Sequence, residues 1–276
     1  MIVQHNMTAL NANRQLGITN TNMAKSTEKL SSGYRINRAA DDAAGLSISE
    51  KMRGQIRGLK QASTNAQDGQ SLIQTAEGAL SEIHSVLQRM RELTVQASND
   101  TNVTADRKAI AKEVRALTSE INRIATQTEF NTMKLLSGKF SNKLLQVGAN
   151  KGQTVSISIK KMTASALSVT ASKIANIIST KQGKQITSLI KIVNAAISQV
   201  STQRSALGAL QNRLDHTIAN ADNMAENLQS SESKIRDVNM ADEMVAYSAK
   251  SILQQAGQSM LAQANRSTQG VLSLLG

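Results

Sequence analysis

An apolar side chain recurs every seven residues for six places in the last third of the chain. The row consists of Val200, Leu207, Leu214, Ala221, Leu228 and Ile235. Seven residues make two turns of an α-helix, so these side chains share one face and predict a long helix with a continuous apolar seam. The 276 residues include no proline, so no helix in the chain is broken by ring clash or by a lost N–H donor.

Similar rows predict two more helices in the first half, from Leu46 to about Ser98 and from Thr104 to about Thr126. The polar residues 99–102 between them are typical of a turn. At about 1.5 Å per residue, the first of these helices would span on the order of 80 Å, which suits a rod better than a compact domain. The chain therefore runs out along one set of helices and returns along another.

The period of the pattern changes in the middle of the chain. Apolar and polar residues alternate strictly from Val155 to Ile159, and we expect a β-hairpin of residues 143–147 against 153–159. The Ser-, Thr-, Ala- and Lys-rich residues 160–185 predict short turns and fragments of helix. Residues 141–200, the middle segment, contain eight lysines and no acidic residue. We expect residues 141–185 to be the basic turn-round, where the chain reverses direction between the outgoing and the returning helices. Buried unpaired lysines are costly, so we expect these side chains to face water.

Each end of the chain carries a shorter helix with a narrow apolar seam. The seam residues are Ile2, Ala9, Leu16, Met23 and Leu30 at the start, and Val245, Ile252 and Met260 on a last helix from about Ala241 to Leu274. The other faces of the first helix are rich in Asn, Thr and Gln, and such a helix needs a packing partner. We expect the two terminal helices to lie side by side. The predicted fold is mainly α: an elongated antiparallel helical rod or coiled-coil bundle with one small β-hairpin, whose termini form a helical coil.

A joint separates the first terminal helix from the long helix that follows. Gly33 follows two serines, and Arg35, Arg38, Asp41 and Asp42 bring four charges into eight residues. We interpret these charges as a salt-bridged joint between two helical layers, and an ordinary polar loop is the alternative. A second polar break at residues 236–239 precedes the last helix.

The sequence offers little chemistry for catalysis. It has no cysteine, so a disulfide, a thiolate nucleophile and a zinc–cysteine site are excluded. The histidines, at positions 5, 84 and 216, have no second ligand at metal-binding spacing. No glycine-rich loop follows a strand and opens a helix, which is where a phosphate would be bound. We expect no enzyme activity, no metal and no cofactor.

Two other classes of protein fit parts of the pattern. The net charge of +12 could indicate a nucleic-acid-binding protein, but no aromatic residue accompanies the lysines of residues 141–200. An intracellular coiled-coil scaffold would explain the heptads but not the hairpin. No apolar run reaches membrane-spanning length, so membrane insertion is not expected, and the first residues do not form a secretory signal peptide.

Several longer motifs resemble those of the bacterial flagellins and occur in the same order along the chain. They occupy residues 28–45, 41–58, 68–80, 87–93, 129–136, 207–214, 232–238 and 258–265. The resemblance covers roughly residues 1–140 and 190–276, and it implies a short flagellin with only the two inner layers of the filament. Residues 1–42 and 237–276 would form the inner layer, and residues 43–236 the rod layer outside it.

The resemblance also implies function and partners. A flagellin polymerises into the extracellular filament used for motility, so the terminal seams would be polymerisation surfaces. It is exported without a cleaved signal. Its partners are an export chaperone, which binds the unpolymerised chain, and the hook-junction and cap proteins of the flagellum. Monomers would also be bound by the flagellin-sensing Toll-like receptor. The positions that match the receptor-binding motif are Gln88, Arg89, Leu93 and Glu113.

Overall fold

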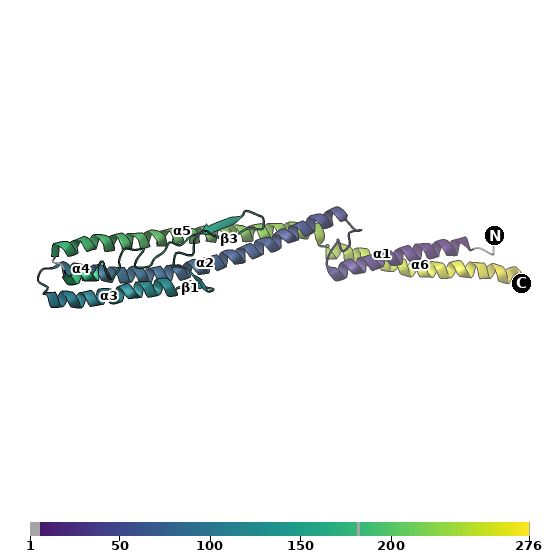
Figure 1. The fold of residues 1–276 in the computed structure, drawn as a ribbon. Helices are drawn as coiled ribbons and strands as arrows, with labels where there is room; N and C mark the ends of the chain where they lie inside the picture. Colours follow the sequence, from purple (N-terminus) through teal and green to yellow (C-terminus); the bar gives the residue numbers. More distant parts are fainter. Residues whose placement is uncertain (1–5, 181–182, 276) are drawn as a thin grey trace. The chain divides into compact units, whose positions relative to one another are not determined.

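The computed structural model describes residues 6–180 and 183–275, and it is mainly α-helical (Figure 1). Its helices are α1 (Met7–Ser32), α2 (Ala43–Ser98), α3 (Thr104–Gln127), α4 (Ala175–Thr180), α5 (Gly183–Arg236) and α6 (Met240–Leu275). Its strands are β1 (Glu129–Phe130), β2 (Met133–Lys134), β3 (Lys143–Gln146) and β4 (Thr154–Ile157). The predicted helices are therefore confirmed to within a few residues at each end.

The chain forms two compact units whose boundaries lie inside α2 and α5. The first unit holds the residues up to Ile56 together with those from Glu226 onward, and the second holds Arg57–Ala225. The second unit has the larger apolar core, to which α2, α3, α4, α5 and the strands contribute. The first unit contains α1, the joint and α6, and its core is small.

The core of the second unit is built from the predicted seven-residue rows. Ile83, Leu87 and Met90 of α2 are fully buried, as are Leu207 and Leu214 of α5. Burial of a Leu or Ile side chain contributes about 1.5–3 kcal/mol, and these rows repeat along each helix. Polar contacts join the antiparallel α2 and α5 at the edge of the core, for example the 2.7 Å hydrogen bond from Gln70 Nε2 to Asp215 Oδ1.

The predicted β-hairpin is confirmed as the antiparallel pair β3–β4, with Lys143 opposite Ile157 and Leu145 opposite Val155. The hairpin packs closely on α2 because two glycines leave room for it. A Cβ at Gly58 would lie 2.9 Å from the Cβ of Ala149, and a Cβ at Gly69 would collide with Leu145. The alternation is also confirmed, since Val155, Ile157 and Ile159 are buried.

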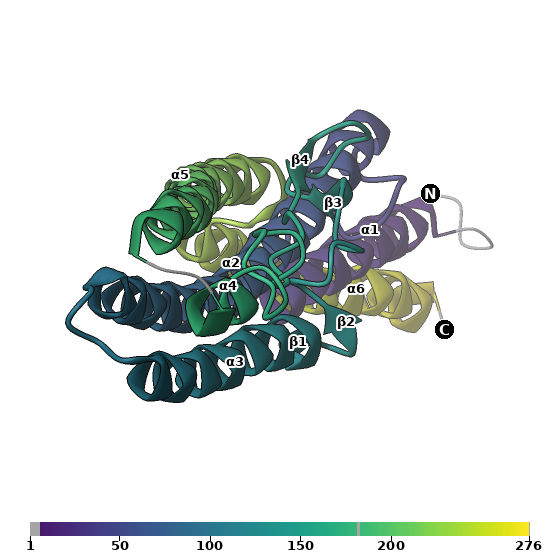
Figure 2. The same ribbon diagram turned by 60° about the vertical axis from the view of Figure 1, so that its left-hand side comes forward.

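A second, shorter ladder was not predicted. β1 and β2 pair antiparallel through a two-residue loop, Asn131 and Thr132, which adopt φ values of 47° and 63°. Each strand has only two residues, too few for a visible alternation of apolar and polar side chains. Residues 160–180 form turns and the short helix α4, which lies beside α3 (Figure 2).

The lysines of the middle segment face water as expected, as far as the structure describes them. Six are exposed and form no ion pair with any described residue: Lys143, Lys151, Lys160, Lys161, Lys173 and Lys191. Lys181 lies outside the described residues, and so does the side chain of Lys184.

Candidate functional site

The joint of the first unit is held by backbone hydrogen bonds between its two polar breaks. Gly33 ends α1 in the left-handed conformation, with φ 75°, and its N–H donates to the carbonyl of Lys29 at 2.9 Å. A glycine suits this position because side chains disfavour positive φ. Tyr34 then pairs with Asp237 in an isolated β-bridge, and the Val238 N–H donates to the Gly33 carbonyl at 3.0 Å. These bonds tie the end of α1 to the start of α6.

Charged side chains reinforce this tie. The Arg236 guanidinium lies 4.8 Å from the centre of the Tyr34 ring, and its Nη1 is 3.0 Å from Glu50 Oε1. The Arg236 side chain is only 12% exposed, so both contacts are partly shielded from water. Arg35 donates from Nη2 to the Ile235 carbonyl at 2.5 Å. The sequence had indicated Arg35 but neither Tyr34 nor Arg236.

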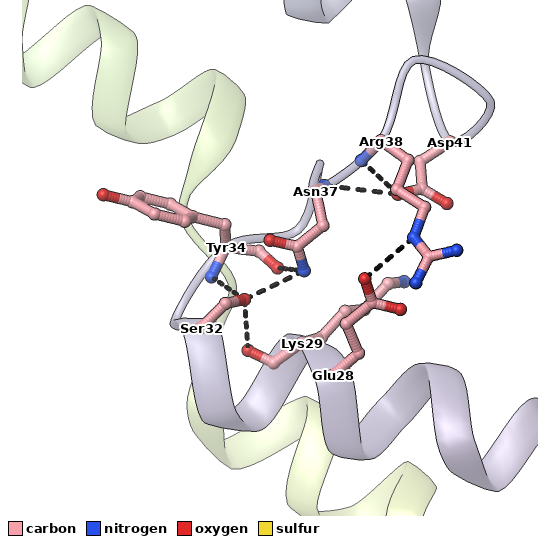
Figure 3. Close-up of polar contacts among 7 residues, drawn as sticks. All are labelled: Glu28, Lys29, Ser32, Tyr34, Asn37, Arg38 and Asp41. Atoms are coloured by element: carbon pink, nitrogen blue, oxygen red, sulfur yellow. Dashed lines mark hydrogen bonds and ion pairs between the residues drawn. The ribbon is translucent and has the colours of Figure 1, made fainter.

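The two aspartates of the joint do not form the predicted salt bridges. Among the described residues, no ion pair links Asp41 or Asp42 to Arg35 or Arg38. Figure 3 shows Arg38 directed at Glu28 instead, with Nε 3.0 Å from Oε1. This correction has a physical reason: short carboxylates bond well to nearby backbone N–H groups, and those groups would otherwise lack partners.

The aspartates accept backbone hydrogen bonds. Asp41 Oδ2 accepts from the N–H groups of Arg38 at 3.0 Å and Asn37 at 3.2 Å (Figure 3). Asp42 Oδ1 accepts from the Gly45 N–H at 2.8 Å and so caps α2, which begins at Ala43. The joint is therefore fixed by caps on the backbone rather than by charge pairs between its own residues.

The cap at Asp41 makes the joint sensitive to acid. Hydrogen bonds from the amides of Arg38 and Asn37 lower the pKa of the Asp41 carboxyl below its ordinary value of 3.8, because they favour the ionised form. The folded-state pKa is the lower one, so the stabilisation is present above the unfolded value and is lost as pH falls through the folded value. In solid-state ¹³C NMR of assembled chains, we expect this carboxyl to titrate below 3.8, with Asp41→Asn identifying its resonance. A midpoint at or above 3.8 would contradict the cap.

The helix pair beyond the joint is antiparallel and has almost no core. Asn6 Nδ2 donates to the Ala264 carbonyl at 2.9 Å at one end, and Leu16 lies against Gly257 further along. Ser26 is the only buried residue of α1 among those described, and no residue of α6 is buried from Met240 to Ser267. A helix pair with so little burial is marginally stable on its own.

The two predicted seams have different surroundings. The α1 seam residues Ala9, Leu16, Met23 and Leu30 are half-buried on the side of α6, and Ile2 lies outside the described residues. The α6 seam residues Val245, Ile252 and Met260 are 71%, 66% and 65% exposed. Val245 and Ile252 point away from α1, and Met260 lies at the side of the pair. The residues of α6 that face α1 are mostly polar or small: Glu243, Ala246, Tyr247, Lys250, Gln254, Gly257, Leu261 and Ala264. The apolar side chains of the α6 seam are thus largely uncovered within the chain.

A groove runs along the helix pair. It has a volume of about 690 Å³, and its lining includes Ala12, Leu16, Leu253, Gly257 and Met260. Other large apolar side chains of the same unit are also exposed, among them Leu10 at 60% and Leu253 at 59%. Surfaces of this kind, rich in exposed apolar residues, mark interaction sites.

The described residues contain no group of three or more His, Asp or Glu side chains that could hold a metal ion. Among the same residues, no helix is long and apolar enough to cross a membrane. His84 and His216 lie singly on long helices, and His5 is outside the described residues.

Comparison with known proteins decides the family. Residues 3–141 match the bacterial flagellin N-terminal helical region, and residues 190–275 match the bacterial flagellin C-terminal helical region. The chain belongs to the bacterial flagellin family. It is 54% identical over 275 residues to a flagellin of Halalkalibacterium halodurans, and 48% identical over 303 residues to a flagellin of Bacillus subtilis. Both alignments cover 100% of this chain and 100% of the relative.

The flagellin match confirms several expectations from the sequence. The chain is a structural subunit of the extracellular flagellar filament and not an enzyme, and it is a short form without a large variable domain. A structure of a putative flagellar hook-associated protein from Vibrio parahaemolyticus shares the fold, with a TM-score of 0.62. That likeness covers 71% of this flagellin and 100% of the other chain at 13% identity, so it concerns the fold alone.

Three of the four expected receptor-binding residues of this flagellin lie together on the surface. Arg89 Nη2 is 2.9 Å from Glu113 Oε1, and Arg89 Nη1 is 3.1 Å from Glu92 Oε2. Gln88 is the neighbour of Arg89 and contacts His84 across one turn of α2, at 3.4 Å. The Arg89 and Glu113 side chains are 51% and 45% exposed, so their ion pair contributes little to stability but orients the guanidinium.

The fourth residue, Leu93, needs a correction. It is 2% exposed and belongs to the core between the helices, so its side chain cannot be the apolar contact of a partner. Truncating it would destabilise the chain by about 2–5 kcal/mol, as is usual for a buried leucine. Any loss of binding in a Leu93 variant would therefore report on folding.

Proposed function

We propose that the terminal helix pair is the polymerisation surface of this filament subunit and becomes fully ordered only when other copies cover it. The observation that carries the proposal is the uncovered apolar seam of α6, in which Val245, Ile252 and Met260 are at least 65% exposed. An amphipathic helix normally turns such a row toward a core. Here the missing core would come from neighbouring subunits.

The repeated contact would be heterologous. Val245 and Ile252 of one copy would enter the groove between α1 and α6 of the next, and a surface that meets a different surface produces an open helical polymer. In this arrangement residues 1–42 and 237–276 would form the inner layer of the filament, and residues 43–236 the rod layer around it. Amide exchange in monomer and filament, described at the end of the Discussion, tests this proposal.

Helix α6 would also contact the proteins that bind flagellin before it polymerises and those that bind the ends of the filament. An export chaperone must cover an apolar helix while the chain is unpolymerised, and the hook-junction and cap proteins must contact the terminal subunits. We propose α6 as the chaperone's target because, among the described residues, it exposes more large apolar side chains than α1 does. A chain without residues 240–276 should fail to bind purified chaperone in gel filtration, and a stable complex would contradict this.

We propose, secondly, that free subunits bind the flagellin-sensing Toll-like receptor through Gln88, Arg89 and Glu113. The support is geometric: Glu92 and Glu113 hold the Arg89 guanidinium in one orientation on the surface, where its side chain is 51% exposed and within reach of a partner. An oriented arginine is a frequent hot spot of protein interfaces. The alternative is a solvated surface ion pair with no partner.

Arg89→Ala is expected to weaken binding of the monomer to the purified receptor ectodomain by about 30-fold, the effect of losing one hot-spot side chain. The fold should be unaffected because the pair is exposed. Arg91→Ala is the matched control, since Arg91 is exposed on the same helix and forms no ion pair with a described residue. Surface plasmon resonance measures both variants, and equal affinities would remove Arg89 from the site.

A further inference from the structure

The single buried residue of α1 is a polar one. Ser26 is 1% exposed, and its hydroxyl lies between two charged side chains of α6. Ser26 Oγ donates to Glu243 Oε1 at 2.5 Å, and Lys250 Nζ donates to Ser26 Oγ at 2.6 Å. Lys250 Nζ is also 4.0 Å from Glu243 Oε1. The Glu243 and Lys250 side chains are 15% and 30% exposed, so the cluster is largely shielded from water.

The rest of the interface between α1 and α6 distinguishes poorly between alternative registers. The row of α6 that faces α1 reads Glu243, Lys250, Gly257 and Ala264 at seven-residue spacing, so its last two members are a glycine and an alanine. Opposite them, the seam of α1 is only half-buried. Small side chains leave space, as the groove beside Leu16 and Gly257 illustrates. Sliding one helix by a turn would therefore change the apolar contacts little.

The polar cluster, in contrast, is satisfied in one register. A hydroxyl offers one donor and two acceptor lone pairs, so it can donate to the carboxylate and accept from the ammonium at once. A shift of one turn would put Met23 or Leu30 in the place of Ser26. Glu243 and Lys250 would then lose their shared hydrogen-bonding partner while remaining shielded, which is unfavourable for charged groups. A single buried polar position is known to specify register in coiled coils.

We propose that Ser26, Glu243 and Lys250 form a polar lock that sets the register of α1 against α6 in the assembled filament. The lock acts within one chain, and it determines which residues the helix pair offers to its neighbours. The competing explanation is that the joint and the bond from Asn6 to Ala264 set the register by themselves, at the two ends of the pair.

Engineered disulfides can report the register because the chain has no cysteine. A Cβ at position 257 would lie 3.9 Å from the Cβ of Leu16, within the usual range for a disulfide. Leu16→Cys with Gly257→Cys therefore reports the observed register. Leu16→Cys with Leu261→Cys reports a shift of one turn. Each isotope-labelled cysteine chain is co-assembled as one part in about ten with unlabelled, cysteine-free chains, so that any disulfide forms within a chain.

After oxidation of the filaments, mass spectrometry measures the ratio of the two disulfides. With the lock intact we expect the 16–257 disulfide to dominate. Lys250→Met and, as a second variant, Ser26→Ala should each shift the ratio toward 16–261 by about tenfold. Lys25→Met removes an exposed lysine of α1 and should leave the ratio unchanged. An unchanged ratio in both lock variants would overturn the proposal and assign the register to the joint and Asn6.

Discussion

Chains that lack residues 1–40 or residues 240–276 are expected to form no filaments at any concentration, while Arg57–Ala225 stays folded. The main apolar cluster of the second unit runs from Ala66 to Leu214, entirely outside both deletions. Each deletion removes one member of the terminal helix pair and with it one side of the groove. Electron microscopy under salting-out conditions measures assembly, and circular dichroism with thermal unfolding measures the fold.

Two outcomes would contradict this expectation. Filaments formed by either truncated chain would show that the second unit polymerises without the helix pair. Loss of cooperative unfolding in both chains would show that the core of the second unit depends on the terminal segments.

Ile252→Asp is expected to raise the critical concentration for polymerisation by at least about 30-fold and to leave the monomer's melting temperature unchanged. Ile252 is 66% exposed within the chain, so a charge there costs the monomer little. In the filament the same side chain would be buried against another copy, and an unpaired carboxylate in such a contact costs about 2 kcal/mol or more.

Val103→Asp is the matched control for this variant. Val103 is 61% exposed, but it belongs to the second unit and precedes α3. Sedimentation of polymer from monomer at graded concentrations measures both variants. Equal critical concentrations for Ile252→Asp and the wild-type chain would exclude the α6 row from the subunit contacts.

The helices and the core could be predicted from sequence because their signal is periodic and local. The row from Val200 to Leu214 is fully buried, and the alternation from Val155 to Ile159 correctly predicted a hairpin strand. In both cases the side chains are covered by the same chain that carries the pattern. Their pattern and their burial therefore agree.

The function of individual side chains was harder to predict, for three physical reasons. The role of Asp41 depended on which nearby donors lacked partners, and these were backbone amides rather than arginines. The position of Leu93 matches both a receptor-binding motif and an apolar row of the core. Only the packing shows that its side chain is buried in the core. The cluster at Ser26 joins residues 217 and 224 positions apart, beyond any local pattern.

The uncovered apolar seam of α6 is the instructive case. An apolar row usually indicates the face that meets the core, and for Val245, Ile252 and Met260 that expectation fails within the single chain. The seven-residue spacing of Glu243 and Lys250 on the inner face was a signal that the sequence analysis did not use. A chain that completes its packing in a polymer carries apolar patterns that its own fold does not explain.

Hydrogen–deuterium exchange of α1 amides in the monomer and in the filament tests the central claim most directly. The claim is that Met7–Ser32 and α6 are marginal in the single chain, where Ser26 is the only buried residue of α1 among those described, and are completed by neighbouring copies. We predict protection factors below about 10 for residues 7–30 in the dilute monomer and strong protection of the same amides in filaments. Strong protection of these amides in the dilute monomer would contradict the account.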